Sequence, residues 1–171
     1  LNLKKEQRSA ILPAQGLFVE LDFNAAEART LIALQGDDQP ESDIHTWLSE
    51  KVYGNKHSRE ECKVKLFSWL YNFSASDIRL EKFFSREIFR DFYSFENNTV
   101  YTPYNRLIPV DERKAQNYLL QSTTSDIVVE NSYNILKFLK DKKSKIAFTM
   151  HDSVVLDMHP SEARHLKEIK N

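Results

Sequence analysis

The stretch KIAFTMHDSVVLDM, residues 145–158, decides the fold class of this chain. Two runs rich in β-formers, 145–150 and 154–158, flank the polar segment 151–153, and this pattern predicts a β-hairpin. Residues 17–23 read LFVELDF, a short apolar run that is typical of a buried strand. The sequence between them is mostly helical in pattern. A strand, several helices and a closing hairpin predict an α+β fold, in which helices pack against an antiparallel sheet.

Clear breaks separate the expected helices. Helix formers fill residues 25–34, and the segment Gly-Asp-Asp-Gln-Pro at 36–40 ends that helix. Asn24, with Glu27 three residues later, resembles a capping box at its start. The remaining expectations are helices at 44–52, 58–73, 77–93 and 111–140, an extended segment at 100–110, and a helix that begins at residue 161.

The composition is that of an ordinary soluble globular protein. Of the 171 residues, 41% are hydrophobic and 29% are charged. No apolar run approaches the roughly 18 residues of a membrane span, and residues 1–8 do not resemble a secretory signal. The single Cys62 excludes an internal disulfide framework and a multi-cysteine zinc site. We therefore expect a reducing, cytosol-like compartment and no membrane partner.

The net charge of −1 contrasts with the basic surplus that nucleic-acid-binding proteins usually carry. Two local clusters are nevertheless positive, and each is either a nucleic-acid contact or a solvated face. The first cluster comprises Lys4, Lys5 and Arg8, and the second comprises Lys137, Lys140, Lys142, Lys143 and Lys145.

Two aspartates stand where strands are expected to end. Asp22 follows the apolar run of the first strand, and Asp152 lies at the tip of the hairpin. Either one alone is usually a cap or a turn residue. If the strand and the hairpin share a sheet, both carboxylates project from the same edge, and two close carboxylates need a cation between them. Such oxygen ligands suit Mg²⁺, and two ions about 3.5–4 Å apart could activate an attacking hydroxyl and stabilise a leaving oxygen.

Four residues spaced by four positions, Arg59, Lys63, Phe67 and Tyr71, form one stripe on the expected helix 58–73. The stripe is roughly 18 Å long, because an α-helix rises about 1.5 Å per residue. Two cations followed by two rings match a nucleoside triphosphate: the cations would meet the phosphates, and the rings would meet the sugar and base. The alternative is an ordinary helix with its rings in the core and its cations in water.

A second polar stripe, Arg113, Asn117 and Gln121, lies on the long expected helix 111–140. Its donors can reach the minor-groove acceptors that all base pairs share, although a solvated helix face has the same pattern. Glu27 is either a capping residue or a neighbour of a nucleotide's sugar. His45, taken alone, reads most simply as a core histidine.

In this order, these residues resemble the motifs of family A DNA polymerases, the bacterial DNA polymerase I type. Residues 22–29, DFNAAEAR, resemble motif A, which is normally Asp-Tyr-Ser-x-x-Glu-x-Arg, and 43–46, DIHT, resemble the Asp-x-His segment that follows it. Residues 59–71 fit motif B, Arg-x-x-x-Lys-x-x-x-Phe-x-x-x-Tyr. Residues 112–121 resemble the stretch Glu-Arg-x-x-x-Asn-x-x-x-Gln, and 151–152 match the His-Asp of motif C. The resemblance covers about residues 8–158.

The resemblance implies a template-directed DNA polymerase that adds deoxynucleotides to a primer 3′ end with two Mg²⁺ ions. Asp22 and Asp152 would hold the ions, and Lys63 would act as general acid toward pyrophosphate. The residues implied at the incoming nucleotide are Arg59, Lys63, His45, Glu27, Phe67 and Tyr71, with Glu27 excluding ribonucleotides. Those implied at the primer–template DNA are Arg29, Arg113, Asn117, Gln121 and His151.

The implied fold is an antiparallel palm sheet with helices packed on it and a reduced helical fingers subdomain. The palm would comprise residues 1–45 and 100–171, and the fingers about 46–99. A thumb and an exonuclease domain would precede Leu1, so the chain is expected to be a fragment that is inactive alone or needs missing lobes or a processivity factor. The expected location is the cytoplasm of a bacterial cell or a phage-infected host.

The sequence departs from the family pattern at several positions. Asn72 and Ser122 stand where the family usually has glycine, and Ser153 stands where an acidic residue usually follows His-Asp. The last change removes a negative charge beside the expected metals. Activity is expected to survive it, because Asp22 and Asp152 are the principal ligands in the family.

The sequence leaves three alternatives open. A single-subunit RNA polymerase shares the two aspartates and a similar helix, but Glu27 and Phe67 favour deoxynucleotides. A non-catalytic DNA-binding fragment would bind DNA with little dependence on Asp22 or Asp152. A metal-dependent nuclease could use two carboxylates, but it would have no use for the stripe on residues 59–71.

Overall fold

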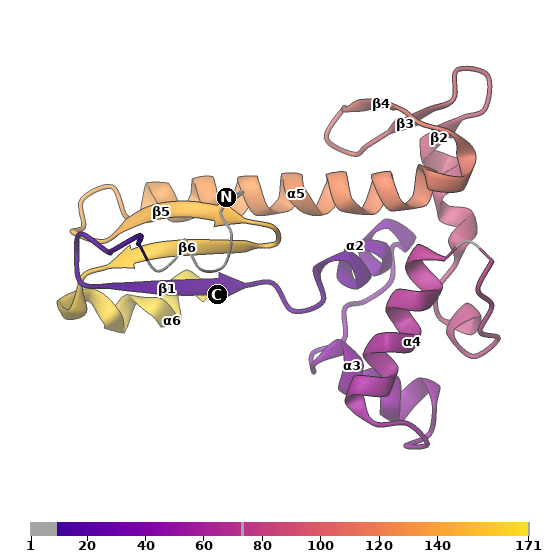
Figure 1. Ribbon diagram of the computed structural model, residues 1–171, viewed down its shortest axis with the longest axis horizontal. Helices are drawn as coiled ribbons and strands as arrows, with labels where there is room; N and C mark the ends of the chain where they lie inside the picture. The colour runs from indigo at the N-terminus through magenta and orange to yellow at the C-terminus, as the bar shows by residue number, and fades with distance from the viewer. Residues whose placement is uncertain (1–9, 73, 171) are drawn as a thin grey trace. The chain divides into compact units, whose positions relative to one another are not determined.

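Strand β1, Leu17–Asp22, pairs with a C-terminal hairpin in one antiparallel sheet, as the sequence predicts. The hairpin consists of β5, Lys145–Met150, and β6, Ser153–Met158, and the strand order is β1-β6-β5 (Figure 1). The structure is a computed structural model that describes residues 10–72 and 74–170. The cluster of Lys4, Lys5 and Arg8 lies outside these residues. The α+β fold class is confirmed.

The chain divides into two compact units. Unit 1 comprises Leu1–Phe23 and Ser125–Asn171, and unit 2 comprises Asn24–Thr124. Helix α5, Glu112–Phe138, contributes its first half to unit 2 and its second half to unit 1. These boundaries differ from those of the expected palm and fingers, and the palm and fingers assignment remains a prediction.

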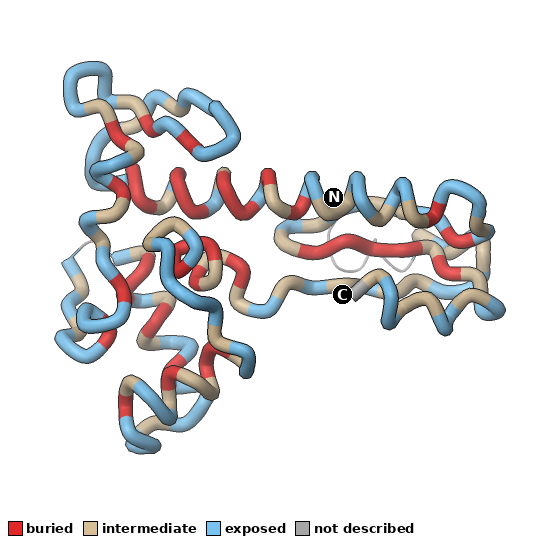
Figure 2. The backbone as a smooth tube through the Cα atoms, turned by 180° about the vertical axis from the view of Figure 1, so that it is seen from behind, coloured by how far each residue is buried: buried red, intermediate tan, exposed pale blue. Residues whose placement is uncertain are grey.

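In unit 1, one face of the sheet forms the core. Val19, Leu21 and the β6 residues Val154 and Leu156 belong to a buried cluster together with side chains of α5 and of α6, Leu166–Lys170. The central strand β6 is buried along most of its length, as Figure 2 shows. Because successive side chains of a strand point to opposite faces, the residues between these core positions lie on the other face.

Unit 2 is mainly helical. It contains α2, Ala26–Gln35, α3, Ile44–Trp47, which continues as a π-helix over Leu48–Val52, and α4, Arg59–Tyr71. A small antiparallel sheet follows, with β2, Tyr93–Ser94, β3, Thr99–Tyr101, and β4, Leu107–Pro109. Its core lies between the helices and includes the fully buried Leu31, Ile44, Leu66 and Trp69.

The helix expected at 77–93 is wrong. The segment forms two 3-10 turns, Leu80–Lys82 and Arg86–Phe92. The carboxylate of Asp77 accepts hydrogen bonds from the backbone N–H groups of Arg79 and Leu80, and the hydroxyl of Ser85 accepts one from Glu87. Such local bonds from side chain to backbone compete with a continuous helix.

The capping box expected at Asn24 and Glu27 is also wrong. Helix α2 begins after Ala25, whose φ is 48°, and no side chain caps it. The amide of Asn24 instead donates to Oδ2 of Asp43 at 2.7 Å. Asn24 therefore connects the start of α2 to the start of α3 and does not cap its own helix.

Candidate functional site

The end of the unit 1 sheet brings the backbones of the two predicted aspartates together. Asp22, the last residue of β1, lies opposite Ser153 in the strand register. Asp152 directly precedes Ser153, and its carbonyl accepts a hydrogen bond from the N–H of Phe23 at 3.2 Å. Asp22 and Asp152 are thus backbone neighbours at one end of the sheet, which is the arrangement that the hairpin prediction required.

The turn that carries Asp152 is tight. His151 has a φ of 54°, in the left-handed region that few non-glycine residues adopt, and the two-residue turn joins β5 directly to β6. This conformation fixes the backbone position of Asp152 immediately before β6. His151 is exposed, and its contact with DNA remains a prediction.

The donor set at this edge fits Mg²⁺. Asp22 and Asp152 offer hard carboxylate oxygens, and within residues 10–72 and 74–170 no group of three or more His, Cys, Asp or Glu side chains is arranged to hold a metal. Mg²⁺ commonly binds through one or two carboxylates and takes its other ligands from water and substrate phosphates. A two-carboxylate edge fits such an ion, and the number of ions remains a prediction.

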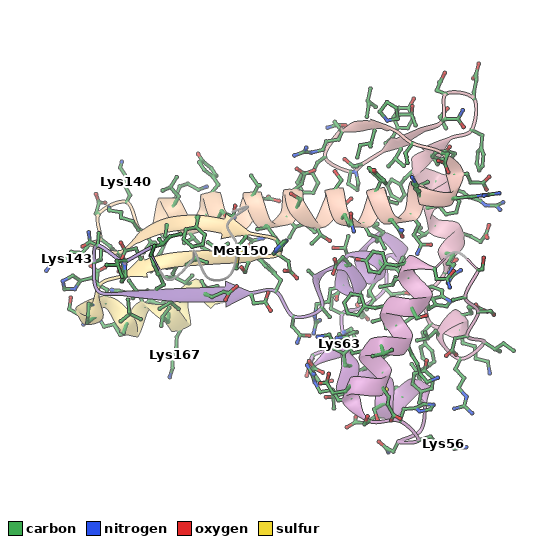
Figure 3. All side chains as sticks on the ribbon, viewed as in Figure 1. Lys56, Lys63, Lys140, Lys143, Met150 and Lys167 are labelled. Atoms are coloured by element: carbon green, nitrogen blue, oxygen red, sulfur yellow. The ribbon has the colours of Figure 1, made fainter. Side chains whose placement is uncertain are left out.

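In unit 2, helix α4 presents the predicted nucleotide stripe and has a strong start. Ser58 caps it, because its hydroxyl accepts from the N–H of Glu61 while the carboxylate of Glu61 accepts from the N–H of Ser58 at 2.7 Å. This capping box fixes the first turn, from which Arg59 projects. Lys63, labelled in Figure 3, follows one turn later and is exposed.

Arg59 is held by Asp43 through two parallel hydrogen bonds. Its Nε and Nη2 donate to Oδ1 and Oδ2 of Asp43 at 3.1 and 3.0 Å. Burial alone would raise the pKa of Asp43, but hydrogen bonds from Arg59, Asn24 and Thr46 outweigh it and hold that pKa well below its usual range. Asp43 therefore stays ionised and orients the guanidinium. Such two-point geometry is also how arginine recognises phosphate.

His45 is buried, as its reading as a core histidine predicts, yet it lies beside the stripe. Its side chain is 3% exposed, and its ring centroid is 6.2 Å from that of Phe67. Burial lowers the pKa of His45, and the positive charges of Arg59 and Lys63 lower it further against the opposing effect of Asp43. Its Nδ1 forms no hydrogen bond within the described part of the chain. The ring is therefore neutral at physiological pH.

The aromatic end of the stripe is ordered by Glu27. The rings of Phe67 and Tyr71 are stacked, with centroids 5.9 Å apart and an interplanar angle of 4°. The hydroxyl of Tyr71 donates to Oε1 of Glu27 at 2.9 Å. Every member of the predicted nucleotide set lies in unit 2. Contacts join His45 to Phe67, Phe67 to Tyr71 and Tyr71 to Glu27, whereas Arg59 contacts Asp43 and Glu60.

The predicted DNA-contacting residues of unit 2 fall into two groups. Arg113 and Gln121 are exposed and Asn117 is half-buried on α5, and Arg113 and Asn117 line a small pocket together with Tyr71. Arg29 is engaged internally, because its guanidinium donates to the carbonyl oxygens of Asn24, Pro40 and Ser42. Arg29 braces the loop before α3, and its predicted contact with DNA remains untested.

Sequence reasoning missed three residues that organise these sites. Asp43 was quoted only as part of a motif, although it orients Arg59, and Glu20 accepts a hydrogen bond from Ser153 at 2.8 Å. Gln116 donates to the carbonyl of Leu70 at 3.1 Å and ties α5 to α4. The sequence around Gln116 gives no clear signal for this role, because its neighbours include Asn117 and Arg113. The other two contacts depend on pairing that the sequence does not display.

No protein-family model and no curated protein matches the sequence. Among solved structures, the chain is similar to the polymerase domain of Pol1 from M. smegmatis, a complex with DNA primer-template and dNTP. The TM-score is 0.67 at 16% sequence identity, over 90% of this chain. The chain has the fold of part of a DNA polymerase domain. It spans 35% of that chain.

The likeness confirms the polymerase-type fold that the motifs imply. At this identity it concerns the fold alone, so the assignment to family A and the roles of the site residues rest on the motifs and on the contacts described above. No helix in the described part of the chain combines the length and apolar character needed to span a bilayer.

Proposed function

We propose that this chain is a catalytic part of a template-directed DNA polymerase of the family A type. One observation carries the proposal: the pairing of β1 with β6, which sets Asp22 opposite Ser153 and beside Asp152. Residues separated by more than a hundred positions thereby meet at one sheet end, and both are of the type that binds Mg²⁺. The polymerase-type fold supports the same conclusion.

The reaction is nucleotidyl transfer. The oxygen of the primer 3′ hydroxyl attacks the α-phosphorus of the deoxynucleotide, and the bond from that phosphorus to the bridging oxygen breaks, so that pyrophosphate leaves. Bound Mg²⁺ ions would favour ionisation of the hydroxyl and neutralise the charge that develops on the leaving oxygen. Asp22 and Asp152 would hold these ions, and the hydroxyl proton passes to water.

The stripe of residues on α4 would bind the incoming nucleotide. Asp43 and Glu60 already accept from three of the five guanidinium N–H groups of Arg59, so Arg59 would offer its remaining N–H groups and its charge to the phosphates. Lys63 would offer a point charge and donate a proton to the departing pyrophosphate. Neutral His45 packs beside Phe67 of the stripe, and its approach to the phosphates would require the buried ring to become accessible. Phe67 and Tyr71 provide stacked rings for the sugar and base, and Glu27 stands beside them at the sugar.

The hydrogen bond between Tyr71 and Glu27 favours a DNA polymerase over an RNA polymerase. A carboxylate fixed beside the two rings occupies the space that a ribose 2′ hydroxyl would need. A ribonucleotide enzyme requires the 2′ position to be open. The expected partners are primer–template DNA and deoxynucleoside triphosphates, with Arg113, Asn117 and Gln121 at the minor groove.

Single-turnover primer extension tests the proposal. Enzyme in excess over primer–template, with Mg²⁺ and the four deoxynucleotides, should extend the primer, and the Asp152→Ala variant should not. Equal extension by both proteins would overturn the assignment of Asp152. If the unaltered chain does not extend, binding of DNA that is independent of Asp22 and Asp152 would instead identify a non-catalytic DNA-binding fragment.

A further inference from the structure

The buried hydroxyl of Ser153 reaches across to the neighbouring strand. Ser153 is 2% exposed, and its Oγ lies 2.8 Å from Oε1 of Glu20 and 2.9 Å from the carbonyl oxygen of Met150. Both partners are acceptors, and the hydroxyl has a single proton to donate. When that proton is donated to Glu20, the bond of 2.8 Å places the Glu20 carboxylate beside Ser153, at the end of the strand pair that carries Asp22.

Glu20 lies on the same face of the sheet as Asp22. The two residues are two positions apart on β1, so their side chains point the same way. Their Cβ atoms are separated by about 7 Å, two strand residues at about 3.3 Å each. The buried core cluster takes Val19 and Leu21 from the opposite face, and both Glu20 and Asp22 are exposed. Glu20 and Asp22 therefore share the face of β1 that is not part of the core.

We propose that Glu20 supplies, from strand β1, the third negative charge of the metal-binding edge, which the uncharged Ser153 does not provide. The inference rests on the proposed function, since it concerns the same Asp22–Asp152 edge. Glu20 is not proposed as a metal ligand, because no three His, Cys, Asp or Glu side chains are arranged to hold a metal ion within the described residues. Its negative charge acts through the electric field. The separation of about 7 Å between the Cβ atoms of Glu20 and Asp22 is within the Debye length of about 8 Å at physiological salt.

The bond to Ser153 is what makes this charge effective. A free glutamate side chain on an exposed strand face would sample many rotamers and spend much of its time far from the edge. Donation from a buried hydroxyl keeps Oε1 beside residue 153, opposite Asp22. Serine at 153 and glutamate at 20 thus form one unit: the serine positions the charge and the glutamate carries it.

Metal binding by the full chain tests this inference without reference to activity. Mn²⁺, a paramagnetic substitute for Mg²⁺, is titrated and its free fraction measured by electron paramagnetic resonance. Glu20→Gln keeps an amide oxygen to accept from Ser153 but removes the charge. We expect it to weaken Mn²⁺ binding by about 3- to 10-fold, the effect of one charge on a divalent ion at this distance in water-like surroundings. Thermal unfolding should be unchanged.

Asp141→Asn is the matched control, because it also removes one carboxylate from unit 1. Asp141 precedes β5, at the end of the strand opposite to Asp152, and Figure 3 shows its neighbours Lys140 and Lys143 far from Met150. It should bind Mn²⁺ like the unaltered chain. Unchanged affinity in Glu20→Gln, or an equal loss in Asp141→Asn, would overturn the inference.

Exchanging the two residues gives a second, independent test. Glu20→Ser alone should weaken Mn²⁺ binding, and adding Ser153→Glu should restore it to within about threefold, because the charge returns from the adjacent strand at a similar distance. Failure of the exchange to restore binding in a folded variant would contradict the role of charge. If Asp22→Asn and Asp152→Asn also leave Mn²⁺ binding unchanged, the metal edge itself, and with it the proposed function, is wrong.

Discussion

At the scale of single residues, Glu27 is the sharpest test of substrate choice. Its carboxylate is fixed by the hydroxyl of Tyr71 at 2.9 Å beside the stacked rings of Phe67 and Tyr71. Glu27→Ala should raise ribonucleotide incorporation relative to deoxynucleotide by at least about tenfold, because the side chain that excludes the 2′ hydroxyl is gone. Single-nucleotide insertion with each sugar measures the ratio.

Tyr71→Phe is the graded control for this prediction. It keeps the ring and the carboxylate but removes the bond between them, so the loss of sugar discrimination should be smaller than in Glu27→Ala. Sugar discrimination that is the same in the unaltered chain and in Glu27→Ala would remove Glu27 from the nucleotide site.

Glu162 makes the stability of unit 1 depend on pH. Its carboxylate accepts hydrogen bonds from the N–H groups of Lys143 and Ser144 and from the hydroxyl of Ser144, and these bonds lower the pKa of Glu162 to about 2. The unfolded value is about 4.5, so the folded state favours the ionised form. The stabilisation is complete above pH 4.5 and is lost as the pH falls toward 2.

Glu162→Gln should therefore lower the melting temperature at pH 7 and lose most of this difference near pH 2. Thermal unfolding followed by circular dichroism at both pH values measures it. A destabilisation of equal size at pH 7 and pH 2 would show that the charge of Glu162 does not contribute.

At the scale of elements, the first turn of α4 contains both a capping box that stabilises the helix and Arg59, a residue of the proposed nucleotide site. Ser58 and Glu61 form a reciprocal capping box in the turn that carries Arg59. Ser58→Ala removes the hydroxyl acceptor and should destabilise the protein by about 1 kcal/mol. Ser58→Thr keeps a hydroxyl and should retain most of the stability.

Urea unfolding followed by tryptophan fluorescence measures this effect, because Trp47 and Trp69 lie on α3 and α4. An alanine variant as stable as the threonine variant would mean that water satisfies the freed N–H groups of the first turn.

The strongly patterned elements are those that sequence predicts. β1, the hairpin and α4 each combine a clear residue period with a break or cap, and the structure places them within a few residues of expectation. The segment 77–93 has helical composition, but Asp77 and Ser85 use their side chains on nearby N–H groups. The hydroxyl of Tyr53 also donates to Asp77, and local composition does not display such a contact between residues 24 positions apart.

Contacts within the candidate site are likewise predictable only where they follow from the pattern of the elements. The meeting of Asp22 with Asp152 follows from two strands and a hairpin once they share a sheet, so the sequence predicts it. The bonds of Asp43 to Arg59 and of Glu20 to Ser153 require the exact register and the packing of α3 on α4. Only the folded chain supplies that information.

At the scale of the whole molecule, the two units have separate cores. The buried cluster of unit 1 and the two clusters of unit 2 have no residue in common among those described. Each unit can therefore lose its packing while the other keeps its own. The alternative is one cooperative transition transmitted along α5, which runs without a break from Glu112 to Phe138.

Two matched core substitutions distinguish these behaviours. Leu156 on β6 and Leu66 on α4 are both fully buried, and Leu→Ala at such a position costs about 2–5 kcal/mol. Both tryptophans of the chain, Trp47 and Trp69, lie in unit 2. Fluorescence therefore reports unit 2, whereas far-ultraviolet circular dichroism reports both units.

We expect the unfolding transition of Leu156→Ala, followed by circular dichroism, to split into two phases, the earlier of which comes from unit 1. The unfolding midpoint followed by fluorescence should move little. Leu66→Ala should shift the fluorescence midpoint first. Because each variant loses the same three carbon atoms from a core, the difference between them isolates the unit affected. Coincident fluorescence and circular dichroism transitions in both variants would show that α5 couples the two cores into one cooperative structure.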